Sequence, residues 1–452
     1  MAKYKAYPEY KDSGVEWLGE VPNHWKTVSI SRLFSRIKRT GYTEKELLSV
    51  YRDYGVIPKS SRDDNNNKPS EDLSPYQLVE PNDLVMNKMK AWQGSIAISE
   101  YEGIVSPAYF VYKPNNILFE LAHPRYVHYL LRNPIYVTQY LSRSKGIRVN
   151  QWDLDPDEFR NIELLLPDKT EQEKIYSFLD HETAKIDNLI EKQQQLIELL
   201  KEKRQAVISH AVTKGLNPDV PMKDSGVEWL GEVPEHWEVS KFGYISLVVR
   251  GGSPRPAGDP TLFNGDYSPW VTVAEITKDN EIYLDSTDTF LTKKGSEQCR
   301  VFKAGTLLLS NSGATLGVPK ILRIDANAND GVVGFELLKI DHEYAYFYLL
   351  TLTTNLRESI KQGSGQPNLN TDIVKSIAIP IPPEKEIQEI VSFIKETIKL
   401  YSSIESGAME QVKLLQERRT ALISAAVTGK IDVRDWVAPD TQDAEEPEEA
   451  SA

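Results

Sequence analysis

A 15-residue segment that occurs twice limits the fold of this chain more than any other feature. Residues 11–25 read KDSGVEWLGEVPNHW and residues 223–237 read KDSGVEWLGEVPEHW, which agree at 14 of 15 positions. A second pair, residues 199–215 and 414–430, matches at an offset of 215. Solenoid repeats recur every ~20 to 50 residues, so two much longer copies predict a duplicated domain instead. A duplication with a pseudo-two-fold axis suits a protein that reads a two-part target.

Length, charge and cysteine content narrow the class of protein. The 452 residues exceed what one hydrophobic core usually spans, and the repeat points to two cores. The net charge of −13 argues against a free-standing, non-specific nucleic-acid binder, although six acidic residues lie in the last 13 positions. Cys299 has no partner for an internal disulfide, and the chain has neither a long apolar run nor a signal-peptide start. We therefore expect a cytoplasmic protein without membrane segments.

Two long stretches carry the periodicity of amphipathic helices. Apolar residues recur every three or four positions through residues 168–212 and again through residues 384–427. The first stretch ends near Gly215 and Pro218, and the second ends at Gly429. Two helices of matching length favour an antiparallel coiled coil, because the pseudo-two-fold axis then passes through its middle.

The regions between these helices predict two globular domains of the α+β class. Residues 26–166 and 238–381 hold short β-type runs broken by Gly, Pro and Asn, and each contains one predicted helix, starting at His123 and at Glu343. The two regions correspond loosely, with Gly94 matching Gly317. Either they drifted unevenly after duplication, or the helices serve one task twice while the globular domains serve different targets.

The predicted organisation has seven parts. They are an N-terminal segment with the first repeat motif (1–25), a first globular domain (26–166), a first long helix (167–214), a linker with the second motif (215–237), a second globular domain (238–381), a second long helix (382–430), and an acidic tail expected to be disordered (431–452).

Several longer motifs, in this order, closely resemble the DNA-specificity subunit of type I restriction-modification systems. They are DSGVEWLGEVPxHW in both copies, EQEKIYSFLDHETAKIDNLIEK from Glu171, LLKEKRQAVISHAVTKG from Leu199, RGGSPRP from Arg250 and GSGQPNLNTDIVKSIAIPIPPEKE from Gly363. The resemblance covers nearly the whole chain except the first residues and the tail.

The resemblance implies a DNA-recognition subunit with no chemistry of its own. Each globular part would be a target recognition domain that reads one half of a bipartite, asymmetric sequence in double-stranded DNA, and the long helices would be the spacer. The partners would be two methyltransferase subunits and two restriction subunits. S-adenosylmethionine, ATP and Mg²⁺ would belong to those partners, so this chain would need no cofactor or metal.

The expected DNA contacts are Arg, Lys, Asn, Gln, Ser and Thr side chains on loops and strand ends, because these groups read bases or bind phosphates. In the first domain we expect Asn87, Lys88, Lys90, Gln93, Arg143, Lys145, Arg148, Asn150 and Gln151. In the second domain we expect Arg250, Ser253, Arg255, Ser310, Asn311, Ser312, Thr315, Lys361, Gln362, Ser364, Gln366, Asn368 and Asn370.

The remaining prominent residues of the duplicated segments have structural interpretations. We expect the tryptophans to pack against the helical pair and the histidines to form internal hydrogen bonds; these residues are Trp17, Trp25, Trp229, Trp237, His24 and His236. Basic residues of the helices either contact the methyltransferase partners or solvate the coil; these are Lys201, Lys203, Arg204, Arg418 and Arg419.

An enzyme is the main rival class, and its signatures are weak. Residues 133–136 (NPIY) lack the second proline of the adenine-methyltransferase motif NPPY and lie inside a predicted helix. The chain has no GxxxxGK[ST] phosphate loop, and its seven His and one Cys form no metal-ligand pattern. Two non-enzymatic functions also fit the sequence, namely a specificity subunit of a methylation-only or type IIB-like system and a coiled-coil scaffold that does not read DNA.

Overall fold

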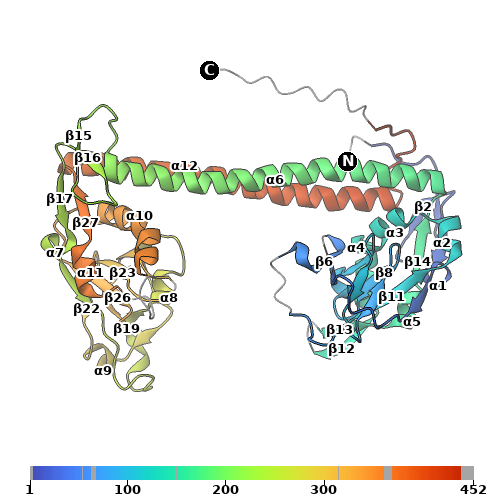
Figure 1. Ribbon diagram of the computed structural model, residues 1–452, viewed down its shortest axis with the longest axis horizontal. Coiled ribbons are helices and arrows are strands. Elements are labelled where there is room, and N and C mark those ends of the chain that lie inside the picture. The colour runs from blue at the N-terminus through green and yellow to red at the C-terminus, as the bar shows by residue number, and fades with distance from the viewer. Residues whose placement is uncertain are drawn as a thin grey trace. The chain divides into compact units, whose positions relative to one another are not determined.

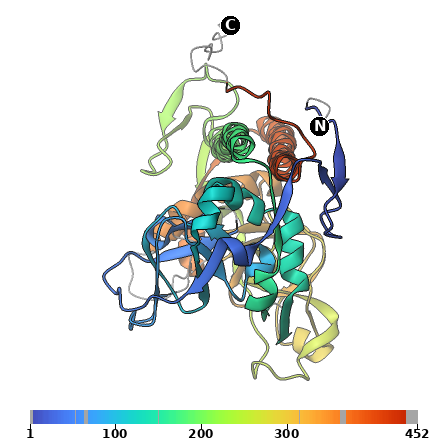
Figure 2. The ribbon, with the colours of Figure 1, turned by 90° about the vertical axis from the view of Figure 1, so that its right-hand side faces the viewer.

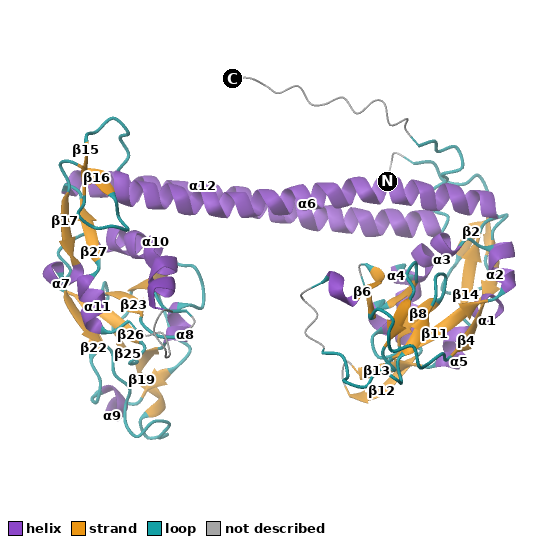
Figure 3. Ribbon diagram, in the orientation of Figure 1, coloured by secondary structure: helices purple, strands orange, loops and turns teal. Residues whose placement is uncertain are grey.

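The computed structural model describes residues 4–52, 54–62, 68–148, 151–313, 315–360 and 369–438. The chain divides into two compact units. Unit 1 comprises Met1–Gln194 with Glu410–Ala452, and unit 2 comprises Gln195–Met409. Both units combine short strands with helices (Figures 1 and 3), which confirms the predicted α+β class.

Unit 1 is built around a four-stranded antiparallel sheet of order β4-β11-β8-β9. The central strand β8 is buried on both faces, because Leu84 and Met86 share a core with helix residues while Val85 shares a second core with residues of other strands. The strands are β1 (Tyr10–Asp12), β2 (Glu20–Pro22), β3 (Lys26–Ser29), β4 (Phe34–Ile37), β5 (Leu48–Tyr51), β6 (Gly55–Pro58), β7 (Gln77–Val79), β8 (Leu84–Asn87), β9 (Ile96–Ile98), β10 (Gly103–Val105), β11 (Tyr109–Pro114), β12 (Ser144–Arg148), β13 (Gln151–Leu154) and β14 (Glu163–Leu166).

The helix predicted from His123 onward is two helices in the structure. Pro134 has no N–H to donate and occupies the first turn of a new helix, while the buried Asn133 side chain caps that helix by accepting from the Ile135 N–H at 2.9 Å. The NPIY residues thus form a helix start. The short helices of unit 1 are α1 (Ile30–Leu33), η1 (Lys59–Ser61), η2 (Ala91–Gln93), α2 (Asn116–Leu121), α3 (Pro124–Leu131), α4 (Pro134–Ser142) and α5 (Pro156–Arg160).

Unit 2 contains a five-stranded sheet of order β18-β26-β23-β24-β20 and a four-stranded sheet of order β21-β19-β25-β22. Its strands are β15 (Met222–Asp224), β16 (Glu232–Pro234), β17 (Glu238–Lys241), β18 (Leu247–Arg250), β19 (Phe263–Val271), β20 (Tyr283–Leu284), β21 (Phe290–Leu291), β22 (Val301–Phe302), β23 (Leu307–Ser310), β24 (Pro319–Leu322), β25 (Ala326–Ala328), β26 (Val332–Glu336) and β27 (Ala378–Ile381). Its short helices are α7 (Phe242–Ile245), α8 (Val273–Ile276), α9 (Lys293–Ser296) and α11 (Thr371–Ser376), with the longer α10 at His342–Ile360.

The two long helices are α6 (Lys169–Lys214) and α12 (Glu384–Val427), as the periodicity predicted. In unit 1, the start of α6 and the end of α12 share one core, which contains Phe178 and Val427. In unit 2, the end of α6 and the start of α12 share another, which contains Val212 and Ile390. The helices are therefore antiparallel in each unit, and Figure 2 shows them side by side.

One tyrosine in each unit ties the end of a long helix to the globular part. In unit 1, the buried Tyr126 hydroxyl lies 3.4 Å from the Val427 carbonyl. In unit 2, the Tyr344 hydroxyl donates to the Val212 carbonyl at 3.0 Å. The same tether thus occurs twice, once for each helix end, as a duplicated frame requires.

The start of the expected tail is part of the fold. Ile431 and Val433 are buried in unit 1, and the Asp432 N–H donates to the Lys5 carbonyl at 2.7 Å. The expectation of disorder from residue 431 is therefore wrong for residues 431–438, because apolar residues there complete a core. Residues 439–452, which hold the acidic run, lie outside the described residues.

The tryptophans of the duplicated motif divide into two kinds. Trp25 and Trp237 are fully buried in the cores that contain the long-helix ends, as predicted. Trp17 contacts Tyr136 of α4, and Trp229 lies near Tyr348 of α10, with ring centroids 5.0 and 6.3 Å apart. Trp17 also packs against the unit 1 core that contains the long-helix ends, and packing of Trp229 on the long helices stays a prediction.

Among the helices of the described residues, none combines the length and the apolar character needed to cross a bilayer. Within the same residues, no three His, Cys, Asp or Glu side chains are grouped so as to hold a metal ion.

Candidate nucleic-acid interface

In unit 1, two of the predicted DNA-contacting segments lie together. The 87–95 loop follows β8 and is closed by a hydrogen bond from the Asn87 N–H to the Ser95 carbonyl at 3.0 Å. Gly94 has φ +91°, a conformation that favours glycine. The Leu154 N–H then donates to the Lys88 carbonyl at 3.2 Å, which joins this loop to the β12–β13 hairpin. These residues are 66 positions apart, so only the fold brings them together.

The candidate side chains of unit 1 differ in how they are engaged. Lys90, Gln93 and Lys145 are exposed, and Lys88 is half-buried. Arg143 is turned toward α4, because its guanidinium donates to the side-chain oxygen of Gln139 at 2.5 Å. The Asn87 side-chain oxygen accepts from the Met89 N–H within its own loop. Asn150 and the side chains of Arg148 and Gln151 lie outside the described residues.

Unit 2 repeats the same backbone frame, by which we mean the loop-closing hydrogen bond, the left-handed glycine and the hydrogen bond from a leucine N–H to the loop. The Ser310 N–H donates to the Val318 carbonyl at 2.9 Å, which closes the 310–318 loop after β23. The Leu369 N–H donates to the Asn311 carbonyl at 2.7 Å, as Leu154 does to Lys88 in unit 1. Gly317 has φ +86° in the position of Gly94, which agrees with the correspondence seen in the sequence.

The candidate side chains of the 310–318 loop split into buried and exposed. Ser310 is fully buried, where its hydroxyl donates to the Thr315 carbonyl and accepts from the Val318 N–H. Asn311 is also fully buried, but its side-chain nitrogen and oxygen have no hydrogen-bond partner among the described residues. Ser312 is half-buried and Thr315 is exposed, which leaves these two at the surface.

The Gly- and Pro-rich turn after β18 surrounds Asp330. The Arg250 Nε donates to the Asp330 carbonyl at 2.6 Å, and the Ser253 hydroxyl donates to the Asp330 carboxylate at 2.8 Å. That Ser253 hydrogen bond, with smaller contributions from Arg250 and Arg255, lowers the pKa of Asp330. A Cβ at Gly251 would lie 2.2 Å from the Asn329 carbonyl oxygen, so this close approach requires glycine.

The last candidate group of unit 2 is only partly described. Asn370 caps α11, since its side-chain oxygen accepts from the Ile373 N–H at 2.9 Å. The rest of the group lies outside the described residues, namely Lys361, Gln362, Ser364, Gln366 and Asn368.

A cavity of about 690 Å³ opens beside the 87–95 loop within unit 1. Trp92 and Gln93 of the loop line one part of it, and Arg132 and Arg419 line another. The Arg132 guanidinium also contacts His128 at 2.8 Å, and burial together with Arg132 lowers the pKa of His128 to about 3. His128 is therefore neutral at physiological pH.

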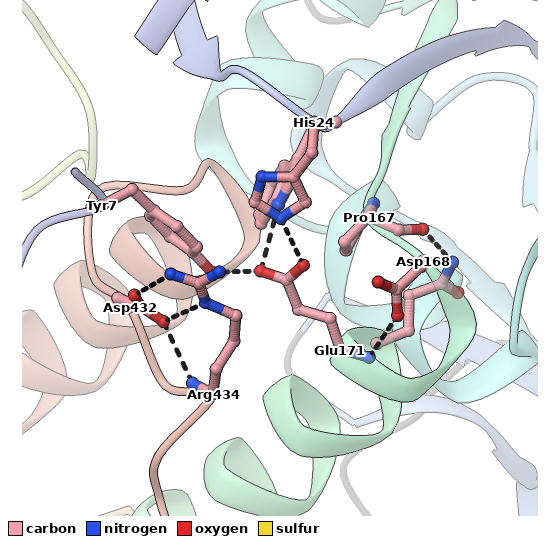
Figure 4. Close-up of polar contacts among 9 residues, drawn as sticks. Tyr7, His24, Pro167, Asp168, Glu171, Asp432 and Arg434 are labelled. Atoms are coloured by element: carbon pink, nitrogen blue, oxygen red, sulfur yellow. Dashed lines mark hydrogen bonds and ion pairs between the residues drawn. The ribbon is translucent and has the colours of Figure 1, made fainter. Parts of the chain in front are cut away.

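A buried carboxylate joins the duplicated motif to the start of α6 in unit 1 (Figure 4). Glu171 accepts hydrogen bonds from the Tyr7 hydroxyl at 2.6 Å and the Trp25 indole at 3.1 Å, and it pairs with His24 at 2.7 Å. Burial and this carboxylate raise the pKa of Tyr7 far above its usual range. The histidines were expected to form internal hydrogen bonds, and His24 confirms this.

Unit 2 holds the matching arrangement. Glu386, near the start of α12, pairs with His236 at 2.9 Å and accepts from the Trp237 indole at 2.6 Å. The expectation for His236 is therefore confirmed as well. Neither glutamate has a direct signal in the sequence, because each lies about 150 residues from its partners.

Three of the predicted partner-binding cations form ion pairs with acidic residues of the long helices. Arg419 forms two hydrogen bonds to Asp187 at 2.8 and 3.1 Å, and Arg204 pairs with Glu405 at 3.6 Å. Lys201 pairs with Glu198 one turn away on the same helix. Lys203 and Arg418 are exposed. A role in partner binding stays a prediction for all five.

Comparison with known proteins agrees with the duplicated geometry. The protein-family model for the type I restriction modification DNA specificity domain matches the chain twice, over residues 22–199 and 234–414. The StySPI type I restriction enzyme specificity subunit of Salmonella potsdam is 20% identical over 436 residues, which cover 91% of this chain and 90% of that protein. The EcoKI specificity subunit of Escherichia coli is 20% identical over 444 residues, again 91% of this chain and 90% of that protein.

Two solved structures share the fold. A chain from the type I R-M system superposes with a TM-score of 0.68 at 15% identity and covers 90% of this chain and 98% of its own length. The HsdS subunit from Thermoanaerobacter tengcongensis gives a TM-score of 0.51 at 15% identity and covers 91% and 98%. With two family matches that span most of its length, the chain belongs to the type I restriction-modification DNA specificity family.

Proposed function

We propose that this chain is the sequence-specific DNA-recognition subunit of a type I restriction-modification complex. Each unit reads one half of a bipartite, asymmetric sequence in double-stranded DNA. The observation that carries this proposal is one backbone frame bearing two different sets of side chains. The 87–95 loop presents Lys88, Lys90 and Gln93, whereas the 310–318 loop presents Ser312 and Thr315 on the same hydrogen-bonded frame. Different side chains on equal frames suit different half-sites.

The long helices fix the spacing between the half-sites in this proposal. Modules that enter successive major grooves on one side of B-DNA lie about 34 Å apart. A helix of 46 residues such as α6 is on the order of 70 Å long, which is enough to span that gap. A paired helix is also stiff, so the number of unread base pairs is constant.

The helices also dock two methyltransferase subunits in this proposal. Exposed apolar residues recur at matching positions of the duplicated helices, with Leu189 matching Ile404 and Leu199 matching Leu414 at the offset of 215. Two equal apolar surfaces favour two copies of one partner. The chain itself is non-catalytic; the methyltransferase subunits use S-adenosylmethionine, and two restriction subunits use ATP and Mg²⁺.

Methylation-sensitive sequencing tests the proposal directly. DNA from cells that express this chain with its methyltransferase partner is sequenced for modified adenines. We expect one motif made of two unlike half-sites separated by a constant gap. A continuous palindrome, or no motif at all, would contradict the proposal.

A further inference from the structure

Strands β12 and β13 form a two-stranded ribbon in unit 1. Lys145 of β12 pairs in register with Asp153 of β13, and both side chains are exposed. A two-stranded ribbon has no core of its own and is marginally stable in water. The contacts that attach it to the domain therefore decide where it points.

The attachment is concentrated on β13. Leu154 is 1% exposed and lies in the core, and its N–H holds the Lys88 carbonyl. Trp152 packs against Trp92 of η2, with ring centroids 5.0 Å apart and an interplanar angle of 60°. The Trp92 indole N–H donates to the Met89 carbonyl at 3.0 Å, which fixes the orientation of that ring. Trp152 thus attaches the ribbon to the 87–95 loop through its contact with Trp92.

The Trp92 position of this contact has no aromatic counterpart in the 310–318 loop of unit 2. In both units the N–H of a buried leucine donates to the loop carbonyl, namely Leu154 to Lys88 in unit 1 and Leu369 to Asn311 in unit 2. The position of Trp92, two residues before the left-handed glycine, is occupied in unit 2 by Thr315. The 310–318 loop keeps the same backbone hydrogen bonds with Thr315 at this position, so the ring pair is not needed to close the loop.

Three lysines near the Trp92–Trp152 contact lack an ion pair within the described part of the chain. Lys88, Lys90 and Lys145 form no ion pair with any part of the chain that the structure describes. Elsewhere in the chain exposed lysines do pair, for example Lys45 with Glu102 and Lys303 with Asp325. Cations without an internal partner suit contacts to phosphates.

We propose that the β12–β13 ribbon is the part of unit 1 that enters the major groove of DNA, and that the Trp92–Trp152 contact positions it. The major groove admits a two-stranded ribbon. Holding the ribbon in place before binding removes the cost of ordering it on the DNA. Trp152 is accordingly a positioning residue for the half-site that unit 1 reads. This inference rests on the proposed function of the chain.

The test is Trp152→Ala in the full chain, assembled with its methyltransferase partner. The measured quantity is the ratio of methylation rates on the native site and on sites altered in one half. We expect discrimination at the half-site of unit 1 to fall about tenfold or more and discrimination at the other half-site to stay unchanged. Trp152→Phe, which keeps an edge-on ring contact, should restore most of the discrimination.

Two controls separate the possible failures. Trp229→Ala removes a half-exposed tryptophan of unit 2 and should leave discrimination by unit 1 intact. If the wild-type complex modifies no bipartite motif, the proposed function itself fails. If the wild type does so and Trp152→Ala keeps full discrimination at both halves, or loses both equally, the ribbon proposal is overturned while the proposed function stands.

Discussion

At the residue scale, the Glu171 carboxylate is the clearest test of how the duplicated motif is held. Its side chain is 3% exposed, whereas that of Glu386 is 36% exposed. Glu171→Ala leaves the buried Tyr7 hydroxyl and Trp25 indole without an acceptor, so we expect a loss of about 3 kcal/mol in the free energy of unfolding. Glu386→Ala is the matched control and should cost about 1 kcal/mol. Equal losses in denaturant titrations of the two variants would contradict this account.

His128 predicts a dependence of stability on pH. Its pKa is about 3 in the folded chain because of burial and Arg132, against ~6.5 in the unfolded chain. As the pH falls from ~6.5 toward 3, the unfolded chain binds a proton that the folded chain does not, so stability decreases in that window. Lowering the pH from 7 to 5 should therefore reduce the free energy of unfolding by ~2 kcal/mol through this residue. Unfolding curves of wild type and His128→Gln should diverge in that range, and parallel curves would refute the prediction.

Single residues also show what the sequence could and could not predict. The internal hydrogen bonds of His24 and His236 were predicted, but their glutamate partners lie in distant helices and carry no local signal. Ser310 and Asn311 belong to a polar loop, and the sequence alone does not reveal that their side chains turn inward. Trp152 was not among the predicted residues, because its contact with Trp92 depends on tertiary structure.

At the scale of elements, the end of the chain completes unit 1. Ile431, Val433 and Trp436 pack in or against its core, and the Lys174 ammonium donates to the Trp436 carbonyl at 3.3 Å. A chain that ends after Lys430 should lose about 4 kcal/mol of stability, because it exposes this apolar surface. A chain that ends after Ala438 keeps these contacts and serves as the control. Equal melting temperatures for the two truncations would show that residues 431–438 contribute nothing.

The long helices predict a change of spacing without a change of half-sites. Deleting seven residues from the middle of both α6 and α12 keeps the apolar stripe in register and shortens each helix by about 10 Å. We expect the gap in the methylated motif to shrink by about three base pairs. An unchanged gap in an active variant would show that the helices do not set the spacing.

Long-period patterns were easier to predict than local breaks. The bounds of α6 and α12 follow from apolar periodicity sustained over many turns. The break between α3 and α4 was missed, although Asn133 before Pro134 is a helix-start signal, because the apolar pattern continues across it. The pairing of strands such as β4 and β11 could not be predicted from the sequence, since it joins residues more than 70 positions apart.

At the scale of the whole molecule, the duplication predicts that the two half-sites can be altered independently. Each unit has its own core and its own loop frame, so a change in one loop does not alter the backbone of the other. The sequence predicted this division from the contrast between near-identical motifs and divergent domains. It could not predict which loops meet, because the bonds that join them link residues dozens of positions apart.

The most direct test of the central claim is methylation-sensitive sequencing of two loop variants beside the wild type. One variant carries Lys88→Ala with Lys90→Ala in unit 1, and the other carries Ser312→Ala with Thr315→Ala in unit 2, each assembled with the methyltransferase partner. We predict that the first variant relaxes or weakens one half of the motif and the second variant the other half, with the gap unchanged in both. Variants that alter the same half, or alter both halves together, would contradict the account of one half-site for each unit.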